Sequence, residues 1–197
     1  MTRSETPPVV AIVLAAGASV RMGRPKALLR VEGRTFVRRI LDTLRDGGID
    51  EIVVVLRPGQ LEVAAEVAAG AGRVAVNPRA DDGQLSSLIA GLDAVDVPGV
   101  DSVLVTLVDV PLIQPSTVRA LVERAPRSPA PIVRVTHRGV HGHPVIFKRA
   151  VFAALRAADP AAGAKTVVNS VQVDDVEVDD PFVARDVDTP EDYRAIL

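Results

Sequence analysis

The sequence of 197 residues contains no cysteine, which excludes disulfides, iron–sulfur clusters and thiolate zinc sites. Aromatic residues amount to only 3%, although hydrophobic residues reach 48%. The core must therefore consist mainly of Val, Ala, Leu and Ile, which suit a parallel sheet flanked by helices. The length fits one α/β domain, which we expect to span residues 1–197.

An excess of charge and a long apolar run are also missing. The net charge of −2 gives no basic excess that would indicate a nucleic-acid partner or a membrane surface. Every apolar run is far shorter than a membrane span. Residues Met1–Pro8 are polar and lack the apolar core of a secretory signal. We therefore expect a cytoplasmic protein with neither a nucleic-acid nor a membrane partner.

Lysine is scarce as well, and one of the three lysines, Lys26, ends a distinctive stretch that begins at Leu14. The β-branched run Val9–Val13 before this stretch predicts a buried strand that leads into a loop. The loop holds two glycines, a serine, two arginines and the lysine. Small residues let backbone N–H groups converge on an anion, and the cations add charge. The stretch therefore predicts a polyphosphate cradle, with a ligand-free glycine-rich turn as the alternative.

The familiar phosphate-loop patterns do not fit this stretch. It contains no G-x-G-x-x-G, and five residues separate Gly17 from Gly23 where a P-loop has four. Arg24-Pro25 also precede Lys26 where a P-loop has glycine directly before its lysine.

Strands and helices alternate along the rest of the chain, which indicates right-handed crossovers and a mostly parallel sheet. An alternating segment at 171–178, broken at Asp174-Asp175, predicts an edge strand. Further strands are predicted at 51–56, 73–76, 100–108 and 132–136, and helices at 35–46, 61–69, up to Val95, from Ser116, at 150–157 and after Thr189.

Polar residues follow several of these strands. Asp109 comes directly after the strand predicted at 100–108, where ligands bind in open α/β sheets, so it could meet a metal or simply cap the turn before Pro111. Ser86 and Ser87 could donate to a phosphate or a base at a helix N-terminus, or form a loop and an N-cap. Asp186 and Asp188 would point the same way if their segment is extended.

All three histidines lie within seven residues, at positions 137, 141 and 143. Their spacing does not place three rings on one face of a helix or strand, and no cysteine assists. We therefore do not expect a zinc site, and we expect His137 and His141 to be solvated hairpin residues.

The stretch from Leu14 to Lys26, L-A-A-G-x-S-x-R-M-G-x-P-K, resembles the opening motif of the MobA-like nucleotidyltransferases. The segment Asp186–Tyr193 matches the closing motif D-x-D-T-P-E-D-Y, and Gly142-His143-Pro144 matches a central one. Ala16 stands where the guanylyl-transferring branch has glycine, so the resemblance is closest to molybdenum cofactor cytidylyltransferases. The resemblance implies a three-layer, Rossmann-like α/β fold with a mostly parallel central sheet.

The resemblance also implies a set of site residues. Mg²⁺ would be held by Asp109 and Asp188, and Arg21, Lys26 and Asp109 would be catalytic. The acceptor would contact Gly142, His143, Pro144 and Lys165, although a solvated helix end explains Lys165 equally well. The nucleotide would contact Leu14, Ala15, Ala16, Gly17, Ser19, Arg21, Lys26, Gln84, Ser86 and Ser87.

The implied reaction moves CMP from CTP to a phosphorylated acceptor such as molybdopterin and releases pyrophosphate, with a molybdoenzyme as a partner that receives the product. Alternatives are another nucleoside triphosphate, a sugar or alcohol phosphate acceptor, or a non-catalytic nucleotide-binding escort. An NAD(P)H-dependent reductase of the nicotine blue oxidoreductase type also stays open, because Val108 stands where the family has glycine. Pro160-Ala161 are a second departure, in the acceptor segment.

Overall fold

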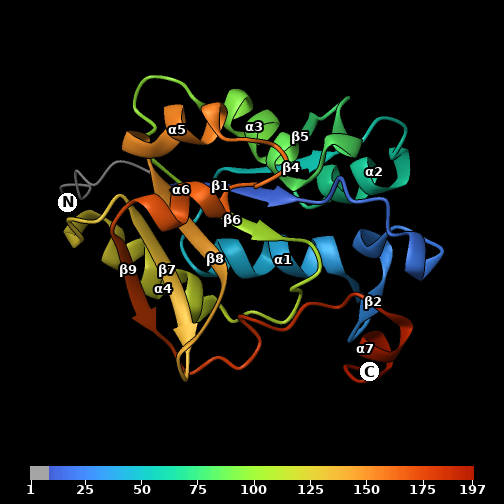
Figure 1. Ribbon diagram of the computed structural model, residues 1–197. Helices are drawn as coiled ribbons and strands as arrows, with labels where there is room; N and C mark the ends of the chain where they lie inside the picture. The colour runs from blue at the N-terminus through green and yellow to red at the C-terminus, as the bar shows by residue number, and fades with distance from the viewer. Residues whose placement is uncertain (1–8) are drawn as a thin grey trace, which may run out of the picture.

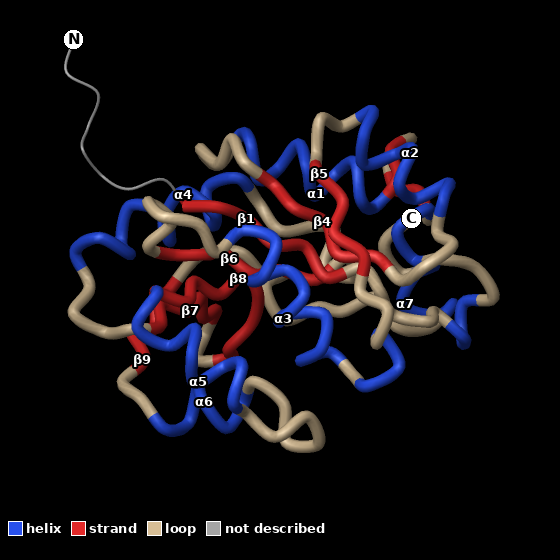
Figure 2. Tube along the Cα trace, turned by 90° about the horizontal axis from the view of Figure 1, so that it is seen from above, coloured by secondary structure: helices blue, strands red, loops and turns tan. Residues whose placement is uncertain are grey.

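The computed structural model describes residues 9–197, so the expectation for Met1–Pro8 lies outside the described residues. A central sheet runs through the middle of the molecule (Figures 1 and 2). Within residues 9–197 its strand order is β5 (Arg73–Val76), β4 (Ile52–Leu56), β1 (Val9–Leu14), β6 (Ser102–Leu107), β8 (Val140–Lys148), β7 (Ile132–His137) and β9 (Val173–Glu177). A separate ribbon joins β2 (Arg30–Val31) to β3 (Arg34–Thr35).

Helices cover both faces of the sheet, which confirms the three-layer α/β fold (Figure 1). The helices α1 (Phe36–Asp46), α2 (Leu61–Ala69) and α4 (Pro115–Arg124) pack on one face, and α3 (Gln84–Val95), α5 (Phe152–Ala157) and α6 (Lys165–Ser170) on the other. The short helix α7 (Pro190–Arg194) lies beside β2. Single 3-10 turns are η1 (Val20–Met22), η2 (Lys26–Leu28), η3 (Ala80–Asp82), η4 (Ala125–Arg127) and η5 (Arg149–Val151). Among the described residues, every helix is too short or too polar to span a bilayer.

The sheet is mostly parallel, as predicted, with β8 as the exception. The strands β5, β4, β1 and β6 are parallel, whereas β8 is antiparallel to β6 and β7. Only Arg138 and Gly139 connect β7 to β8, and both have positive φ, 50° and 77°. A two-residue connection of this kind joins antiparallel neighbours, because a parallel pair needs a long crossover.

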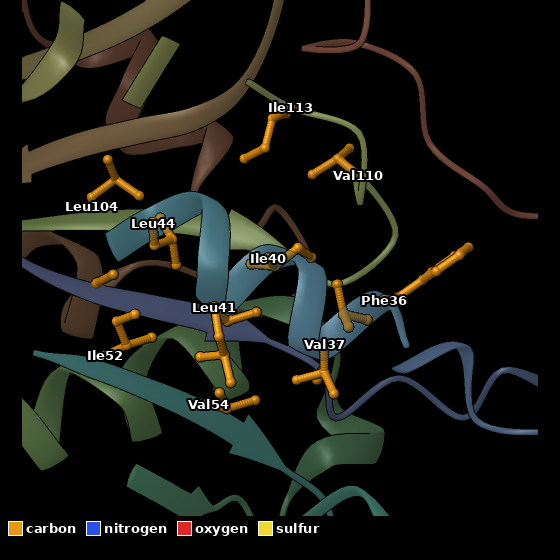
Figure 3. Packing of buried hydrophobic residues seen from close by; sticks show 14 of the residues in the cluster. Phe36, Val37, Ile40, Leu41, Leu44, Ile52, Val54, Leu104, Val110 and Ile113 are labelled. Carbon is orange, nitrogen blue, oxygen red and sulfur yellow. The ribbon is translucent and has the colours of Figure 1, made fainter. Parts of the chain in front are cut away.

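The core is built from aliphatic side chains on both faces of each inner strand. Along β1, Ala11 and Val13 face the α1 side, while Val10 and Ile12 face the α3 side. This continuous burial explains why the strand has no polar alternation. Helix α1 covers its face with residues at helical spacing (Figure 3), namely Phe36, Val37, Ile40, Leu41 and Leu44, all 0% exposed.

The predicted break at Asp174-Asp175 is wrong, because both residues lie inside the continuous strand β9. Each carboxylate has a cationic partner that accommodates its charge. Asp174 pairs with Arg124 at 2.7 Å, and Asp175 pairs with Arg134 at 2.8 Å. The edge position predicted for this strand is confirmed.

Asp180 anchors the C-terminal segment to the start of α4. It is 1% exposed, and its Oδ2 accepts hydrogen bonds from the Gln114 amide at 2.8 Å and the Thr117 hydroxyl at 2.7 Å. Its Oδ1 accepts from the Phe182 amide at 3.0 Å. The carboxylate therefore supplies acceptors at a helix N-terminus, where N–H groups lack partners.

We expect Asp180→Ala to lower the free energy of unfolding by about 3 kcal/mol, because a helix cap is lost and buried donors lose their acceptor. Urea denaturation measures the loss. Asp180→Asn keeps the size and one acceptor oxygen, so it should retain part of the stability. Wild-type stability in both variants would contradict the anchoring role.

Candidate functional site

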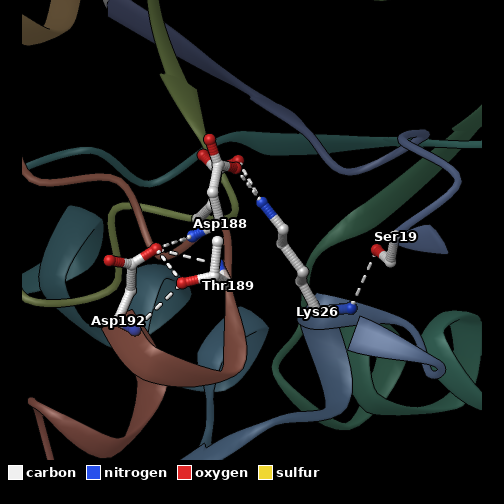
Figure 4. A network of polar contacts seen from close by, with 6 residues as sticks. Ser19, Lys26, Asp188, Thr189 and Asp192 are labelled. Atoms are coloured by element: carbon white, nitrogen blue, oxygen red, sulfur yellow. Dashed lines mark hydrogen bonds and ion pairs between the residues drawn. The ribbon is translucent and has the colours of Figure 1, made fainter. Parts of the chain in front are cut away.

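Lys26, Asp109 and Asp188 meet beyond the carboxyl end of β1 and β6, although they come from distant parts of the chain. Figure 4 shows Lys26 pointing toward Asp188. The Lys26 Nζ lies 3.0 Å from Asp109 Oδ2 and also pairs with Asp188 Oδ1. The Lys26 side chain is only 12% exposed. One ammonium group therefore contacts both carboxylates that the family resemblance implies to act as a pair.

The sheet register explains how Asp109 reaches this place. Leu14 of β1 is in register with Leu107 of β6, and the Val108 amide donates to the Leu14 carbonyl at 3.1 Å. The chain leaves β6 directly beside the loop that follows β1. The Val187 amide then donates to the Asp109 carbonyl at 2.8 Å and brings Asp188 to the same edge.

The electrostatics of this cluster suit a hard cation. Burial opposes the charge of Lys26, but hydrogen bonds and attraction from Asp188 and Asp109 outweigh it and raise the pKa of Lys26. Among the described residues, Asp109 Oδ1 is buried and has no hydrogen-bond partner. A free carboxylate oxygen beside a second carboxylate fits a divalent cation such as Mg²⁺.

Within the described residues, no group of three or more His, Asp or Glu side chains is arranged as a metal centre. A cation here would be held by Asp109 and Asp188, with its remaining positions filled by water and phosphate oxygens, as suits Mg²⁺.

A cavity of about 390 Å³ opens on this cluster, and most residues predicted to bind nucleotide line it. Val20 of the predicted cradle and Val108 also line it, and so does Gln60, which sequence reasoning did not assign to the site. The only signal for Gln60 is its place in the turn after β4, at the same edge of the sheet. The predicted residues that line the cavity are Leu14, Ala15, Ala16, Gly17, Ser19, Arg21, Lys26, Gln84, Ser87, Asp109 and Asp188.

The loop after β1 is folded back on itself by Ser19. This residue has φ 51°, in the left-handed region, and its carbonyl accepts from the Met22 amide at 3.0 Å. The Ser19 hydroxyl accepts from the Lys26 amide at 3.1 Å (Figure 4). Ser19 thus shapes the loop that presents the Lys26 side chain, while Arg21 lies exposed at the rim.

Ser86 lies outside this cavity wall, although the resemblance implies a nucleotide contact. Its hydroxyl accepts from Asn77 Nδ2 at 2.9 Å and has the Arg79 carbonyl oxygen at 2.7 Å. It is 7% exposed. The N-cap alternative for Ser86 and Ser87 is wrong, because α3 begins at Gln84 with Gly83 as its cap residue. Ser86 anchors the loop before α3.

A second cavity, of about 630 Å³, adjoins the first and shares Leu14, Gln84 and Leu107 with it. Of the four residues expected to contact the acceptor, Gly142, His143 and Lys165 line this cavity, whereas Pro144 is buried and does not line it. Much of the remaining wall is apolar and comes from Leu88, Val105, Val145, Phe147 and Val168.

The histidines differ in their surroundings. Burial lowers the pKa of His143, although a hydrogen bond to the Val105 backbone and the charge of Asp109 favour protonation. His141 is exposed, with Nδ1 3.6 Å from Asp175. His137 is not fully solvated as predicted. It is half-buried, and its Nδ1 lies 2.8 Å from the Val178 carbonyl oxygen.

Asp186 and Asp188 line different cavities, and their segment is not part of a strand, so the condition under which they would point the same way is not met. Asp188 lines the first cavity and Asp186 the second. Partial burial and the negative charges of Asp109 and Asp188 raise the pKa of Asp186.

Comparison with known proteins adds family information to this geometry. The family model of the MobA-like NTP transferase domain matches residues 11–176. Nicotine blue oxidoreductase of Paenarthrobacter nicotinovorans is 34% identical over 100% of both chains. A probable molybdenum cofactor guanylyltransferase of Opitutus terrae is 34% identical over 52% of this chain and 48% of that protein.

Among solved structures, Rv0371c of Mycobacterium tuberculosis has a TM-score of 0.86 and 31% identity, covering 98% of this chain and 99% of its own. A second structure of that protein, in complex with manganese, has a TM-score of 0.80 and 30% identity over 96% and 98% of the two chains.

Proposed function

The chain belongs to the MobA-like NTP transferase family, and on that premise we propose that it transfers CMP from CTP to a phosphorylated acceptor such as molybdopterin, with Mg²⁺ as cofactor. The observation that carries the proposal is the Lys26–Asp109–Asp188 cluster at the junction of two adjoining cavities. The proposal includes residues 1–197 as one domain, a cytoplasmic location and a molybdoenzyme that receives the product.

In this reaction the nucleotide occupies the first cavity and the acceptor the second. An acceptor phosphate oxygen forms a bond to the α-phosphorus, and the bond from the α-phosphorus to the bridging oxygen of pyrophosphate breaks. The shared wall residues Leu14, Gln84 and Leu107 lie where the two substrates would meet. A phosphate acceptor is already anionic, so positioning and charge stabilisation suffice without a strong general base.

Each part of the cluster has a role in this proposal. Asp109 and Asp188 hold Mg²⁺, which supplies charge stabilisation at the phosphates when bound. Lys26 and Arg21 neutralise the departing pyrophosphate. The backbone of Ala15–Ser19 holds the nucleotide. The choice of CTP rests on Ala16, which lines the first cavity and stands where the guanylyl-transferring branch has glycine.

Lys26 must then exchange partners, because its ammonium group pairs with the same carboxylates that would bind Mg²⁺. We expect Lys26→Gln to bind Mn²⁺ about tenfold more tightly without nucleotide, since a competing cation is removed, and to lower kcat about a hundredfold. Electron paramagnetic resonance of Mn²⁺ and pyrophosphate release measure the two effects.

Arg24→Gln is the matched control, because Arg24 is an exposed cation of the same loop that contacts the Leu28 carbonyl. Arg24→Gln should leave both the Mn²⁺ affinity and kcat within twofold of wild type. Unchanged or weaker Mn²⁺ binding by Lys26→Gln would contradict the exchange.

The proposed function is tested by pyrophosphate release from CTP with Mg²⁺ and molybdopterin. We expect turnover that depends on all three components and falls when GTP replaces CTP. Binding of CTP without any turnover would instead indicate a nucleotide-binding escort.

A second candidate function is NAD(P)H-dependent reduction of a small molecule. Two observations favour it: the full-length relative named nicotine blue oxidoreductase, and Val108, which is 7% exposed and lines the first cavity where the family pattern has glycine. In this reading the cofactor donates a hydride and metal ions are not needed. Oxidation of NADPH that persists with a chelator present and in Asp109→Asn would favour the reductase over the transferase.

A further inference from the structure

The candidate site is assembled from three segments, those of Lys26, Asp109 and Asp188, and two different sets of hydrogen bonds connect them. The Asp109 and Asp188 segments are connected by the main chain, because the Val187 amide donates to the Asp109 carbonyl at 2.8 Å. In the described part of the chain, every hydrogen bond between residues 26–31 and residues 186–197 involves a side chain. Lys26 bonds to Asp188, and the Tyr193 hydroxyl bonds to the main chain of Arg30. These contacts can therefore be removed by substitution.

Asp188 is fixed to the helix that follows it. The Asp192 carboxylate oxygen Oδ2 accepts from the Asp188 amide at 3.1 Å and the Thr189 amide at 2.8 Å (Figure 4). The Thr189 hydroxyl accepts from the Asp192 amide at 3.2 Å, which completes a capping box. The main chain at Asp188 must therefore move with α7.

Tyr193 fixes α7 to the segment that follows Lys26. Its hydroxyl donates to the Arg30 carbonyl at 2.6 Å and accepts from the Arg30 amide at 3.2 Å. Its ring meets the Phe36 ring edge-on, with centroids 5.9 Å apart and planes at 70°. The Leu29 amide donates to the Lys26 carbonyl at 3.0 Å, so Arg30 follows directly after the turn that carries Lys26.

We infer that the Tyr193 hydroxyl is a positioning group: by fixing α7 it keeps the Asp188 carboxylate at the cluster, so that a cation that displaces the Lys26 ammonium meets both carboxylates already in place. This inference rests on the proposed function, which assigns Asp109 and Asp188 to the metal. Supporting hydrogen bonds of this kind matter because ligands held within a fraction of an ångström bind and act better than mobile ones. The contact of the Tyr193 ring with Phe36 stabilises the fold, whereas the Tyr193 hydroxyl fixes the position of Asp188.

Tyr193→Phe separates these two roles, because it removes the hydroxyl and keeps the ring. We expect the variant to bind Mn²⁺ about tenfold more weakly and to lose about tenfold in kcat, with KM for CTP within twofold of wild type. The urea midpoint should change little. A purely structural role of Tyr193 would move the midpoint without moving the Mn²⁺ affinity.

Arg194→Ala is the matched control in the same helix. It removes the 2.9 Å pair between Arg194 and Glu191 and leaves the Tyr193 hydroxyl in place. Its Mn²⁺ affinity and kcat should equal those of wild type.

A further readout does not depend on the folding of Tyr193→Phe. The sequence has one tyrosine and no tryptophan, so tyrosine emission reports on Tyr193 alone. We expect Mg²⁺ to change this emission in the wild type and in Arg194→Ala, because a cation bound to Asp188 shifts α7 and with it Tyr193. We expect no change in Asp188→Asn, which lacks the carboxylate ligand.

The outcomes separate the inference from the proposed function. The positioning role would be overturned if Tyr193→Phe bound Mn²⁺ with an affinity within twofold of wild type. It would also be overturned if the tyrosine emission of the wild type did not change when Mg²⁺ binds. Failure of the wild type to bind Mn²⁺ both with and without CTP would overturn the metal assignment of the proposed function itself.

Discussion

Asp109→Asn is expected to lower kcat for nucleotidyl transfer by about a thousandfold, equivalent to about 4 kcal/mol of lost transition-state stabilisation. The substitution keeps the shape of the side chain but removes the charge at the centre of the cluster. Lys26 loses one of its two carboxylate partners, and the buried Oδ1 is no longer part of a carboxylate. Steady-state pyrophosphate release at saturating CTP measures the loss.

Asp101→Asn is the control, because Asp101 precedes the opposite end of the same strand β6 and its side chain is 61% exposed. This variant should keep wild-type kcat. A loss of less than tenfold in Asp109→Asn, with the fold intact by circular dichroism, would remove Asp109 from the metal site.

Gly142→Ala is expected to lower the free energy of unfolding by about 3 kcal/mol, because an added methyl group would overlap the neighbouring backbone. A Cβ at position 142 would lie 1.9 Å from the Val183 carbonyl oxygen. The His143 amide donates to that same oxygen at 2.7 Å, so the two segments cannot separate without losing a hydrogen bond. A fall in melting temperature of about 10 °C, seen by calorimetry, would match this cost.

Gly17→Ala is the control for stability, because nothing lies within 4 Å of a Cβ at Gly17. It should melt within a degree or so of the wild type. If Gly142→Ala melted at the same temperature, the close crossing of β8 and the Val183 segment would be contradicted. The crossing also carries the chain toward Asp188, so Mn²⁺ binding should weaken along with stability.

Much of the fold follows from local signals in the sequence. The run Val9–Val13 is apolar at every position, which predicts an inner strand, and the structure buries Val10–Val13 on both faces of the sheet. Thr35 caps α1 with its side chain, as predicted, because a hydroxyl there can accept from the Arg38 amide. The bounds predicted at 61–69 and 73–76 agree with α2 and β5.

The contacts that organise the site are not local, and the sequence did not predict them. Asp180 resembles a surface acid in Asp179-Asp180-Pro181, yet it is buried because α4 supplies donors from a distant part of the chain. Tyr193 has no local sign of its partner Arg30. The hydrogen bonds of the Ser86 hydroxyl with Asn77 and with the Arg79 carbonyl oxygen have no local sign in the sequence either.

The pairing of Asp109 with Asp188 was expected from a resemblance to a family rather than from the residues themselves. The two-residue spacing of Asp186 and Asp188 would point them the same way in an extended segment, but this segment is not part of a strand and the two residues line different cavities. Periodicity arguments hold only where the chain is a regular helix or strand. The site lies where regular structure ends, so geometry rather than pattern decides it.

The central claim is that a nucleoside triphosphate and a divalent cation bind together at Lys26, Asp109 and Asp188. Thermal unfolding with CTP, GTP or NADPH, each with and without Mg²⁺, tests it most directly. At one hundred times its Kd, CTP with Mg²⁺ should add about 2.7 kcal/mol of stability to the wild type, or about 8 °C, and much less to Asp109→Asn. Stabilisation by NADPH that is equal with and without Mg²⁺, together with none by any nucleoside triphosphate, would contradict the account.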